Sequence, residues 1–502
     1  MSAEPVDAER PIHPIRPIRA LRRPWTVEIL TADEIEQVHE TSLRVLAEIG
    51  LEVRSPTVVA DLAREGADVD EAAMRVRFPA PMVETALAVV PPTFTLAGRD
   101  PAYDLPIDGS AGYLSTDGTP SEIVDLETGM RRPTTLADLR DTTLLGDAVP
   151  EIGYLWPAVA PADVDPRMQS VEAARIMLAN STKHANHNEC YSAFDARAVL
   201  EMGAAVVGGE DELRRRPVIS TYQCAISPLM FDGGPIEAAL EFARAGVPTG
   251  FVTMAVGMAA APATLAGHLV STNAELLGGI TILETLVPGT PTYYGPYQAF
   301  MDLRSGGMNL AWGPEDVMLK LASAQLGRRY GLRINIQGFQ TGAKTQDWQA
   351  GAQHGISLMT IAIAGSAELI AATGTIYGAG VWAHENVLLD AELFDIICRA
   401  TEGFEVSEET LAFDAIREAG PGGHFLASPH TLRHMRDRWT AHLFGAETWE
   451  EWEAAGRPSA RERAHERVKQ ILAEHQPEPL PDDVAAELDR LVERHRRTLA
   501  DG

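Results

Sequence analysis

The chain is poor in cysteine and in long apolar runs, and each shortage excludes a class of protein. Its 502 residues include three cysteines, Cys190, Cys224 and Cys398, which are too few for a disulfide framework. No run of about twenty apolar residues occurs, so we expect no membrane span. Residues 1–25 lack the apolar core of a secretory signal and are expected to form a flexible Pro/Arg-rich arm. Together these features predict a cytoplasmic protein.

Positive charge is also scarce. The chain has 42 Lys and Arg against 71 Asp and Glu, which gives a formal net charge of −29 at pH 7. Proteins that bind nucleic acid carry basic surfaces, so we expect no nucleic-acid partner. The negative charge favours cationic ligands, although the effect is screened beyond about 10 Å and solubility alone also explains an acidic surface.

Several catalytic and metal-binding motifs are missing. There is no GxGxxG after the first predicted strand, no GxSxG, no HExxH and no CxxC. His184 and His187 lie three apart on a predicted strand and therefore face opposite sides. His424, His430 and His434 form a cluster in which the sequence shows no further ligand, so we expect capping or packing there. We predict no metal site.

What the sequence does contain is an alternation of short apolar strands with longer helical patterns, such as residues 192–209 and 314–331. Strands that alternate with helices form a parallel sheet, and eight such units close into a TIM-like (β/α)8 barrel of the α/β class. An open, doubly wound sheet is the alternative. The predicted strands are 154–160, 183–190, 218–226, 248–256, 291–297, 333–339, 367–374 and a weaker eighth at 422–427.

Three segments are predicted beyond the N-terminal arm. Residues 26–150 should form a helical and β-hairpin extension, with turns at Asp117-Gly118 and Thr128-Gly129. The barrel should span 151–450. Residues 451–502 should form a charged helical tail that either packs on the barrel or joins an oligomer interface.

Polar and aromatic side chains gather where the predicted strands end. Ligands of such barrels bind at the carboxyl ends of the strands. The stretch "GFQTGAKTQDWQAGAQHG" at 338–355 follows one of these ends and precedes an apolar helix, so we expect it at the barrel mouth. Aromatic faces bind quaternary ammonium groups, with ~0.5–2 kcal/mol per contact, while helix N-termini favour an anion, and the combination suits a betaine. Ordinary packing is the alternative for each residue. The candidate site residues are Glu189, Tyr222, Tyr297, Gln337, Phe339, Gln340, Lys344, His354 and Trp382.

Three long stretches resemble the trimethylamine methyltransferase family. They are "MDLRSGGMNLAWGPEDVMLKLASAQLGRRYG", "YGLRINIQGFQTGAKTQDWQAG" and "GPGGHFLASPHTLRHMR", and the similarity extends over residues 30–445. The resemblance implies a TIM-like barrel and methyl transfer from an amine to the cobalt of a partner corrinoid protein. Founding archaeal members of the family use pyrrolysine, which this chain lacks. It therefore resembles the non-pyrrolysine branch, whose known members demethylate glycine betaine and related quaternary amines.

The chemistry implied by this resemblance needs no acid or base at the nitrogen, because a quaternary nitrogen leaves as a neutral amine. We therefore assign no catalytic residue and expect the protein to orient the methyl group, exclude water and hold the cation. Tyr297, Phe339 and Trp382 should form part of a cation box, with Glu189 adding negative charge. Gln337 and Gln340 should receive the substrate carboxylate, and Lys344 should pair either with that carboxylate or with Asp347.

The expected partners are a quaternary amine and a corrinoid protein that carries the methyl-accepting cobamide, with no cofactor bound tightly by this chain. A homo-oligomer is also expected. Two alternatives remain open: the same demethylation with a folate or other acceptor, and a barrel that binds betaine without chemistry. Glycine betaine, proline betaine, carnitine, γ-butyrobetaine and choline all remain possible substrates.

Overall fold

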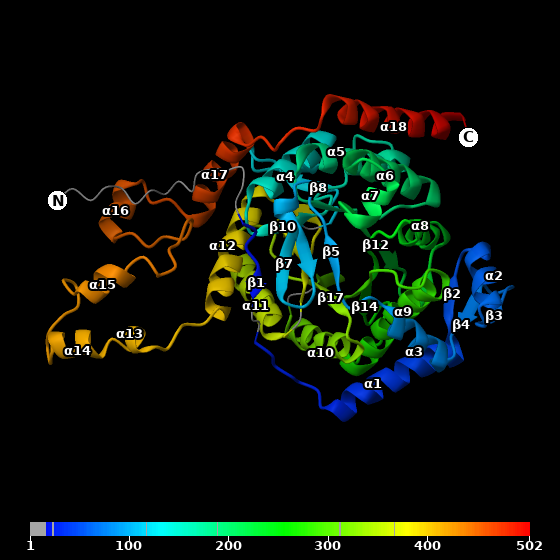
Figure 1. Ribbon diagram of the computed structural model, residues 1–502, viewed down its shortest axis with the longest axis horizontal. Coiled ribbons are helices and arrows are strands. Elements are labelled where there is room, and N and C mark those ends of the chain that lie inside the picture. The colour runs from blue at the N-terminus through cyan, green and yellow to red at the C-terminus, as the bar shows by residue number, and fades with distance from the viewer. Residues whose placement is uncertain are drawn as a thin grey trace.

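A closed barrel of eight parallel strands forms the centre of the molecule (Figure 1). The computed structural model describes residues 17–22, 25–116, 118–187, 189–310, 313–365 and 367–501. Each barrel strand pairs with the next in the chain, and the last pairs with the first, which closes the ring and rules out the open sheet. The strands are β7 (Ala111–Thr116), β10 (Ile152–Leu155), β11 (His184–His187), β12 (Ile219–Ala225), β14 (Thr249–Gly257), β15 (Tyr293–Asp302), β17 (Arg333–Gln337) and β18 (Leu369–Thr373).

Seven of the predicted strands are confirmed, and the eighth is wrong. Residues 422–427 form turns rather than a strand. Their place is taken by β7, which lies within the segment expected to be the N-terminal extension. The sequence of β7, "AGYLST", is buried along its whole length, but it directly precedes the turn predicted at Asp117-Gly118, so its pattern favours a hairpin strand over a barrel strand.

The two predicted hairpin turns have different outcomes. β8 (Glu122–Val124) pairs with β9 (Arg131–Pro133) in an antiparallel hairpin, so the turn at Thr128-Gly129 is confirmed. The turn at Asp117-Gly118 does not form a hairpin, because β7 and β8 belong to different sheets. Asp117 itself lies outside the described residues.

Helices cover the outside of the barrel, and their capping residues explain where they begin. Ser192 accepts from the backbone of Asp195 to start α6 (Ala193–Val207), and α10 (Pro314–Tyr330) begins at a proline and ends before Gly331. The long α9 (Leu265–Leu286) is apolar on nearly every side because it lies between the barrel and the N-terminal helices. The other covering helices are α4 (Leu136–Ala148), α5 (Gln169–Asn180), α7 (Glu210–Arg215), α8 (Gly233–Arg244), α11 (Trp348–Ile363) and α12 (His384–Thr401).

The N-terminal extension packs on α9 and closes one end of the barrel. A capping box of Thr31 and Glu34 starts α1 (Ala32–Arg44), which contacts α9 together with α3 (Ala80–Val89). The hairpin of β5 (Phe94–Leu96) and β6 (Leu105–Ile107) shares a cluster of buried residues with the first residues of the barrel strands, including Tyr293. The amino-terminal end of the barrel is therefore filled. Smaller elements here are β2 (Leu51–Val53), α2 (Pro56–Arg64), β3 (Asp68–Asp70) and β4 (Arg75–Arg77).

The chain after the barrel divides into a projecting arm and a docked tail. Figure 1 shows the arm extending away from the barrel. In the tail, α17 (Ala460–Glu474) packs on α12 and α4, and α18 (Asp482–Asp501) packs on α5 and α6, which settles its predicted position in favour of packing on the barrel. No helix within the described ranges is long and apolar enough to span a membrane. The arm contains α13 (Glu408–Leu411), α14 (Phe413–Ala419), α15 (Pro429–His434) and α16 (Trp449–Ala454).

Candidate active site at the barrel mouth

Three aromatic rings from alternate strands meet inside the barrel. Trp156 directly follows β10, and its ring centroid lies 4.7 Å from that of Tyr222 on β12 and 6.2 Å from that of Tyr297 on β15. Tyr222 continues the cluster to Tyr293, with 4.6 Å between ring centroids. Because these strands are not neighbours in the ring, their side chains can meet only across the interior. The rings form a buried aromatic floor.

Above this floor the barrel is open to solvent. Val252 belongs to the interior cluster, so Met254, two residues further along β14, also points inward. Met254 is 41% exposed, although its neighbours Thr253 and Ala255 are fully buried. Solvent therefore reaches the interior from the carboxyl ends of the strands, where ligands of this fold bind.

The interior also holds polar atoms that lack hydrogen-bond partners. Asn186 pairs in register with Ser220, two residues before Tyr222, and so shares its inward face. Neither amide atom of Asn186 has a partner within the described ranges, and the same is true of Trp156 Nε1 and Gln337 Oε1. A buried polar group left unpaired costs about 1–3 kcal/mol, so a ligand that supplies partners here gains affinity.

The Tyr297 hydroxyl fixes the orientation of one further amide. It donates a 2.7 Å hydrogen bond to Oδ1 of Asn335 on β17. Asn335 therefore faces the interior, and so does Gln337, two residues later. These inward-facing side chains are neutral, which suits a substrate that loses its positive charge during the reaction. The exception is Glu189, which lies at the rim.

Glu189 is a carboxyl group at the rim of this interior. It follows β11, and its carboxylate accepts from the backbone of Cys224, whose side chain shares the inward face of Tyr222. Burial raises the pKa of Glu189 to about 7, and the hydrogen bond from Cys224 only partly offsets this rise. The carboxylate thus gains its charge near neutral pH.

Sequence comparison identifies the family. The family model described as trimethylamine methyltransferase (MTTB) matches residues 6–500. The chain belongs to the trimethylamine methyltransferase family. Corrinoid-dependent methyl transfer is the function of this family. This confirms the resemblance seen in the sequence.

Curated relatives of this methyltransferase act on two different amines. The chain is 34% identical to trimethylamine methyltransferase MttB of Desulfitobacterium hafniense (strain DSM 10664 / DCB-2), covering 92% of each protein. It is 31% identical to the glycine betaine methyltransferase of Desulfitobacterium hafniense (strain Y51), covering 92% of this chain and 96% of that one. The solved structure of the Methanosarcina barkeri monomethylamine methyltransferase (MtmB) aligns with a TM-score of 0.48 and 11% identity, over 90% of this chain and 89% of that one.

The methyltransferase brings only some of the predicted site residues together. Tyr222, Tyr297 and Gln337 line the interior, with Glu189 at its rim. Phe339 and Trp382 are fully buried in a different cluster, between the barrel wall and the covering helices. They therefore do not join Tyr297 in a single box.

Both of these aromatic residues pack against histidines. The ring of Phe339 lies 5.7 Å from that of His354 on α11. The ring centroid of Trp382, on β20 (Val381–Trp382), lies 6.4 Å from that of His384. The Trp382 ring also leaves no room for a side chain at Gly374. These contacts indicate that Phe339 and Trp382 stabilise the barrel wall.

The polar stretch at 338–355 forms a loop followed by the first turns of α11. Asp347 caps the helix by accepting from the backbone of Gln349 and Ala350, at 2.9 and 3.2 Å. His354 Nδ1 lies 2.7 Å from Asp390, whose other oxygen accepts from Thr373 at the end of β18. This network ties α11 to the barrel wall behind the mouth.

Lys344 and Gln340 belong to the same loop but differ in exposure. Gln340 is fully buried. Lys344 is exposed, donates to the Gly342 carbonyl at 2.7 Å and lies 5.0 Å from the ring centroid of Tyr377. The predicted pairing of Lys344 with Asp347 is not observed.

Trp156, Asn186 and Met254 line the interior but were not among the predicted residues. Trp156 had a signal in the sequence, since it lies in the predicted strand "YLWPAVA". The strand ends at Leu155, earlier than predicted, and Trp156 directly after it contributes to the aromatic floor. Asn186 and Met254 lie within strands, and only the register of the barrel shows which way they point.

Exposed apolar side chains surround the mouth of the methyltransferase. They follow β11, β12, β14 and β18, or lie on the hairpin of β15 with β16 (Gly307–Leu310). Contiguous exposed apolar residues mark interaction surfaces. We refer to them as the apolar rim: Tyr191, Ile226, Met258, Leu303, Met308 and Tyr377.

Proposed function

We propose that the chain demethylates a betaine-type quaternary amine at the barrel mouth and passes the methyl group to the Co(I) form of a corrinoid protein. The observation that carries this proposal is the aromatic floor beneath a neutral interior that is open to solvent. Trp156, Tyr222 and Tyr297 offer ring faces to a trimethylammonium group, with ~0.5–2 kcal/mol for each good contact.

The other end of a betaine has partners nearby. The amide groups of Asn186 and Gln337 include donors and acceptors in the buried interior, and Asn186 has both amide atoms unpartnered within the described ranges. Amide N–H groups donate to a carboxylate without adding a charge. We place Asn186 and Gln337 at the carboxylate, with Gln340 and Lys344 retained from the sequence prediction as candidates. Glu189 attracts the cation when ionised.

The reaction requires positioning more than proton transfer. The reduced corrinoid supplies the nucleophile, and the amine leaves as a neutral group. The rings and amides of this chain have to hold the nitrogen–methyl bond in line with the opening of the barrel. The buried floor keeps water from the nitrogen, so the cation meets only ring faces and neutral dipoles.

We assign the docking of the corrinoid protein to the apolar rim. A protein that brings its cobamide to the mouth has to cover this surface, and the rim offers exposed side chains from successive strand ends, such as Ile226, Met258 and Leu303. The barrel interior fits a small amine, whereas the rim fits a protein partner. We therefore propose that the cobamide stays bound to the partner.

We also propose that the chain forms a homo-oligomer through the arm. α13, α14 and α15 bury no residue, and Phe404 and Leu426 beside them are 86% and 88% exposed. A transient partner would leave these apolar side chains in water most of the time, whereas a second copy of the chain is always present.

The three free cysteines fit a reducing compartment, and we place the protein in the cytoplasm.

Calorimetric titration with the amines tests this site. Wild-type protein should bind glycine betaine or a related quaternary amine, and Trp156→Leu should weaken binding about 2–30-fold through loss of one ring contact. The matched control is Phe339→Leu, which removes a buried aromatic ring outside the interior and should leave affinity unchanged. Equal losses in the two variants, with both correctly folded by circular dichroism, would exclude the aromatic floor as the binding site.

A further inference from the structure

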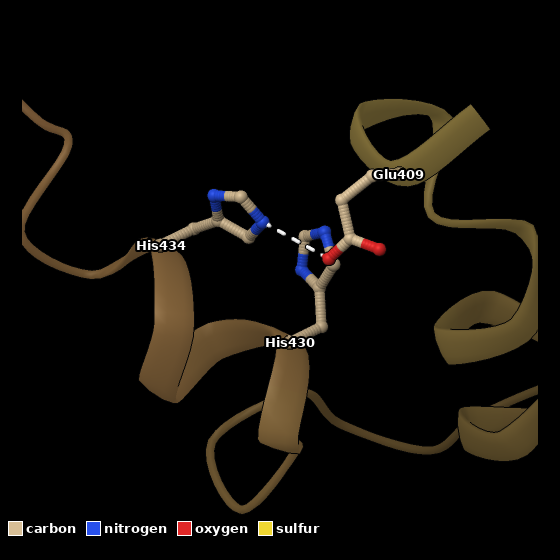
Figure 2. A group of neighbouring side chains, drawn as sticks. All are labelled: Glu409, His430 and His434. Atoms are coloured by element: carbon tan, nitrogen blue, oxygen red, sulfur yellow. Dashed lines mark hydrogen bonds and ion pairs between the residues drawn. The ribbon is translucent and has the colours of Figure 1, made fainter. Parts of the chain in front are cut away.

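The arm carries a group of metal-ligating side chains far from the barrel mouth. Glu409 lies on α13, whereas His430 and His434 lie one turn apart on α15 (Figure 2). One ligand atom from each residue lies within 4.8 Å of the others. Figure 2 shows the three side chains pointing toward one another.

The spacing of these atoms is close to that of a zinc site. Ligands of tetrahedral zinc lie about 2.0–2.1 Å from the metal, and therefore about 3.3 Å from one another. His434 Nε2 and Glu409 Oε1 are 3.4 Å apart. The rings of His430 and His434 lie 4.5 Å apart at the i, i+4 spacing that puts two histidines on one helix face. Closure of the site requires only side-chain movement.

Two further observations point to a ligand. His430 Nε2 is out of contact with solvent and has no hydrogen-bond partner within the described ranges. The Nδ1 atom of His434 lies 2.7 Å from Asp437. Histidines that bind metal usually donate their second ring N–H to a carboxylate, which orients the ring and strengthens the ligand.

Arg433 is the competitor for this site. Its guanidinium donates to Glu409 Oε1 at 2.8 and 3.2 Å and neutralises the carboxylate. A divalent ion supplies twice that charge at a shorter distance and can use either carboxylate oxygen. Arg433 therefore lowers the affinity for metal without blocking the site.

The arm also has a structural need for such an ion. α13, α14 and α15 have no buried residues of their own, so few apolar contacts hold them in place. Small elements without a core are commonly stabilised by a metal, because the free energy of binding becomes free energy of folding. We propose that Glu409, His430 and His434 bind one divalent zinc-type ion that joins α13 to α15, with water in the fourth position.

Zinc binding to the full-length chain tests this proposal. Metal-free protein should take up one equivalent of Zn²⁺ in equilibrium dialysis followed by elemental analysis, and zinc should slow cleavage of residues 404–435 by a protease. His430→Ala, His434→Ala and Glu409→Gln should each abolish this equivalent. Asp437→Asn should weaken binding about 10–100-fold, as expected for a residue that orients a ligand.

Two variants make the test specific. His424→Ala removes an exposed histidine from the same segment, outside the cluster, and should leave the zinc stoichiometry unchanged. Arg433→Gln should tighten binding, because it removes the competing cation but keeps all three ligands. Absence of a bound equivalent in the wild type, or zinc uptake that survives His430→Ala and His434→Ala, would overturn the proposal.

Discussion

The pH dependence of amine binding follows from the position of Glu189. The pKa of this carboxyl is raised to about 7 by burial, so its charge appears between pH 6 and pH 8. About one-tenth of the molecules carry the charge at pH 6 and about nine-tenths at pH 8. The ionised form attracts a cation and the protonated form does not, so affinity for a quaternary amine should rise with pH.

The size of this effect can be worked from the charge alone. A carboxylate and a cation in a partly buried site gain about 1–2 kcal/mol, which makes the ionised protein bind about 5–30-fold more tightly. When the affinities of the ionised and protonated forms are weighted by their fractions, the observed affinity for the amine should increase about 3–8-fold from pH 6 to pH 8. Isothermal titration of glycine betaine at several pH values measures this directly.

Glu189→Gln should make the affinity independent of pH over this range, because the amide cannot ionise. A matched control exists in Glu284 on α9, whose pKa burial also raises to about 7. Its carboxylate accepts from the backbone of Gly289, before β15 begins, and so lies at the opposite end of the barrel. Glu284→Gln should keep the wild-type slope. A flat wild-type profile, or a slope that survives in Glu189→Gln, would refute the placement of Glu189 at the cation.

Three further predictions concern stability and partner binding. Tyr297→Phe should lower the free energy of unfolding by about 1–3 kcal/mol, because it removes the hydrogen bond to the buried Asn335 while it keeps the ring; an unchanged denaturant midpoint would contradict that bond. Burial alone would raise the pKa of Asp147, but the hydrogen bond from His475 and the charge of Lys183 outweigh burial and lower this pKa. The ionised Asp147 therefore stabilises the folded state above about pH 4, and this stabilisation is lost as the pH falls through the lowered pKa. Asp147→Asn should therefore cost about 3 kcal/mol at pH 7 and progressively less below pH 4, as measured by urea unfolding; a cost that did not shrink in acid would point to packing instead. Leu303→Asp on the apolar rim should weaken binding of the corrinoid protein at least tenfold and leave amine affinity unchanged; equal binding of the corrinoid protein by this variant and the wild type would move the docking surface elsewhere.

Much of the barrel could be predicted because its strands are apolar and its helices have clear caps. The capping boxes and the proline at the start of α10 appear in the sequence as they do in the structure. β7 could not be assigned to the barrel this way, because "AGYLST" directly precedes the turn signal at Asp117-Gly118, which favours a hairpin. Strand pairing across 256 residues, between Tyr113 of β7 and Leu369 of β18, closes the ring and leaves no local signal.

The site could be predicted in part. Tyr222 and Tyr297 could be predicted because they are aromatic and lie on strands expected to lead to the barrel mouth. Phe339 and Trp382 have the same local pattern, yet they pack against His354 and His384 behind the barrel wall. The direction of a side chain depends on where its strand ends, and a shift of one residue reverses it.

Contacts between residues far apart in the sequence explain the other features that could not be predicted. The histidine cluster of the arm showed no further ligand in the sequence, because Glu409 lies 21 residues before His430 and only the fold brings them together. Asp390 similarly reaches His354 from another helix.

Methyl transfer from a quaternary amine by this chain can be followed by proton NMR of the reaction. Purified protein would be incubated with glycine betaine, proline betaine, carnitine, γ-butyrobetaine or choline, with Co(I) cobalamin in place of the corrinoid protein. One of the five should lose a single methyl group to give its tertiary amine, with methylcobalamin formed in equal amount. Binding of one of these amines without formation of any tertiary amine, under conditions in which the cobalamin stays reduced, would show that the chain does not demethylate it.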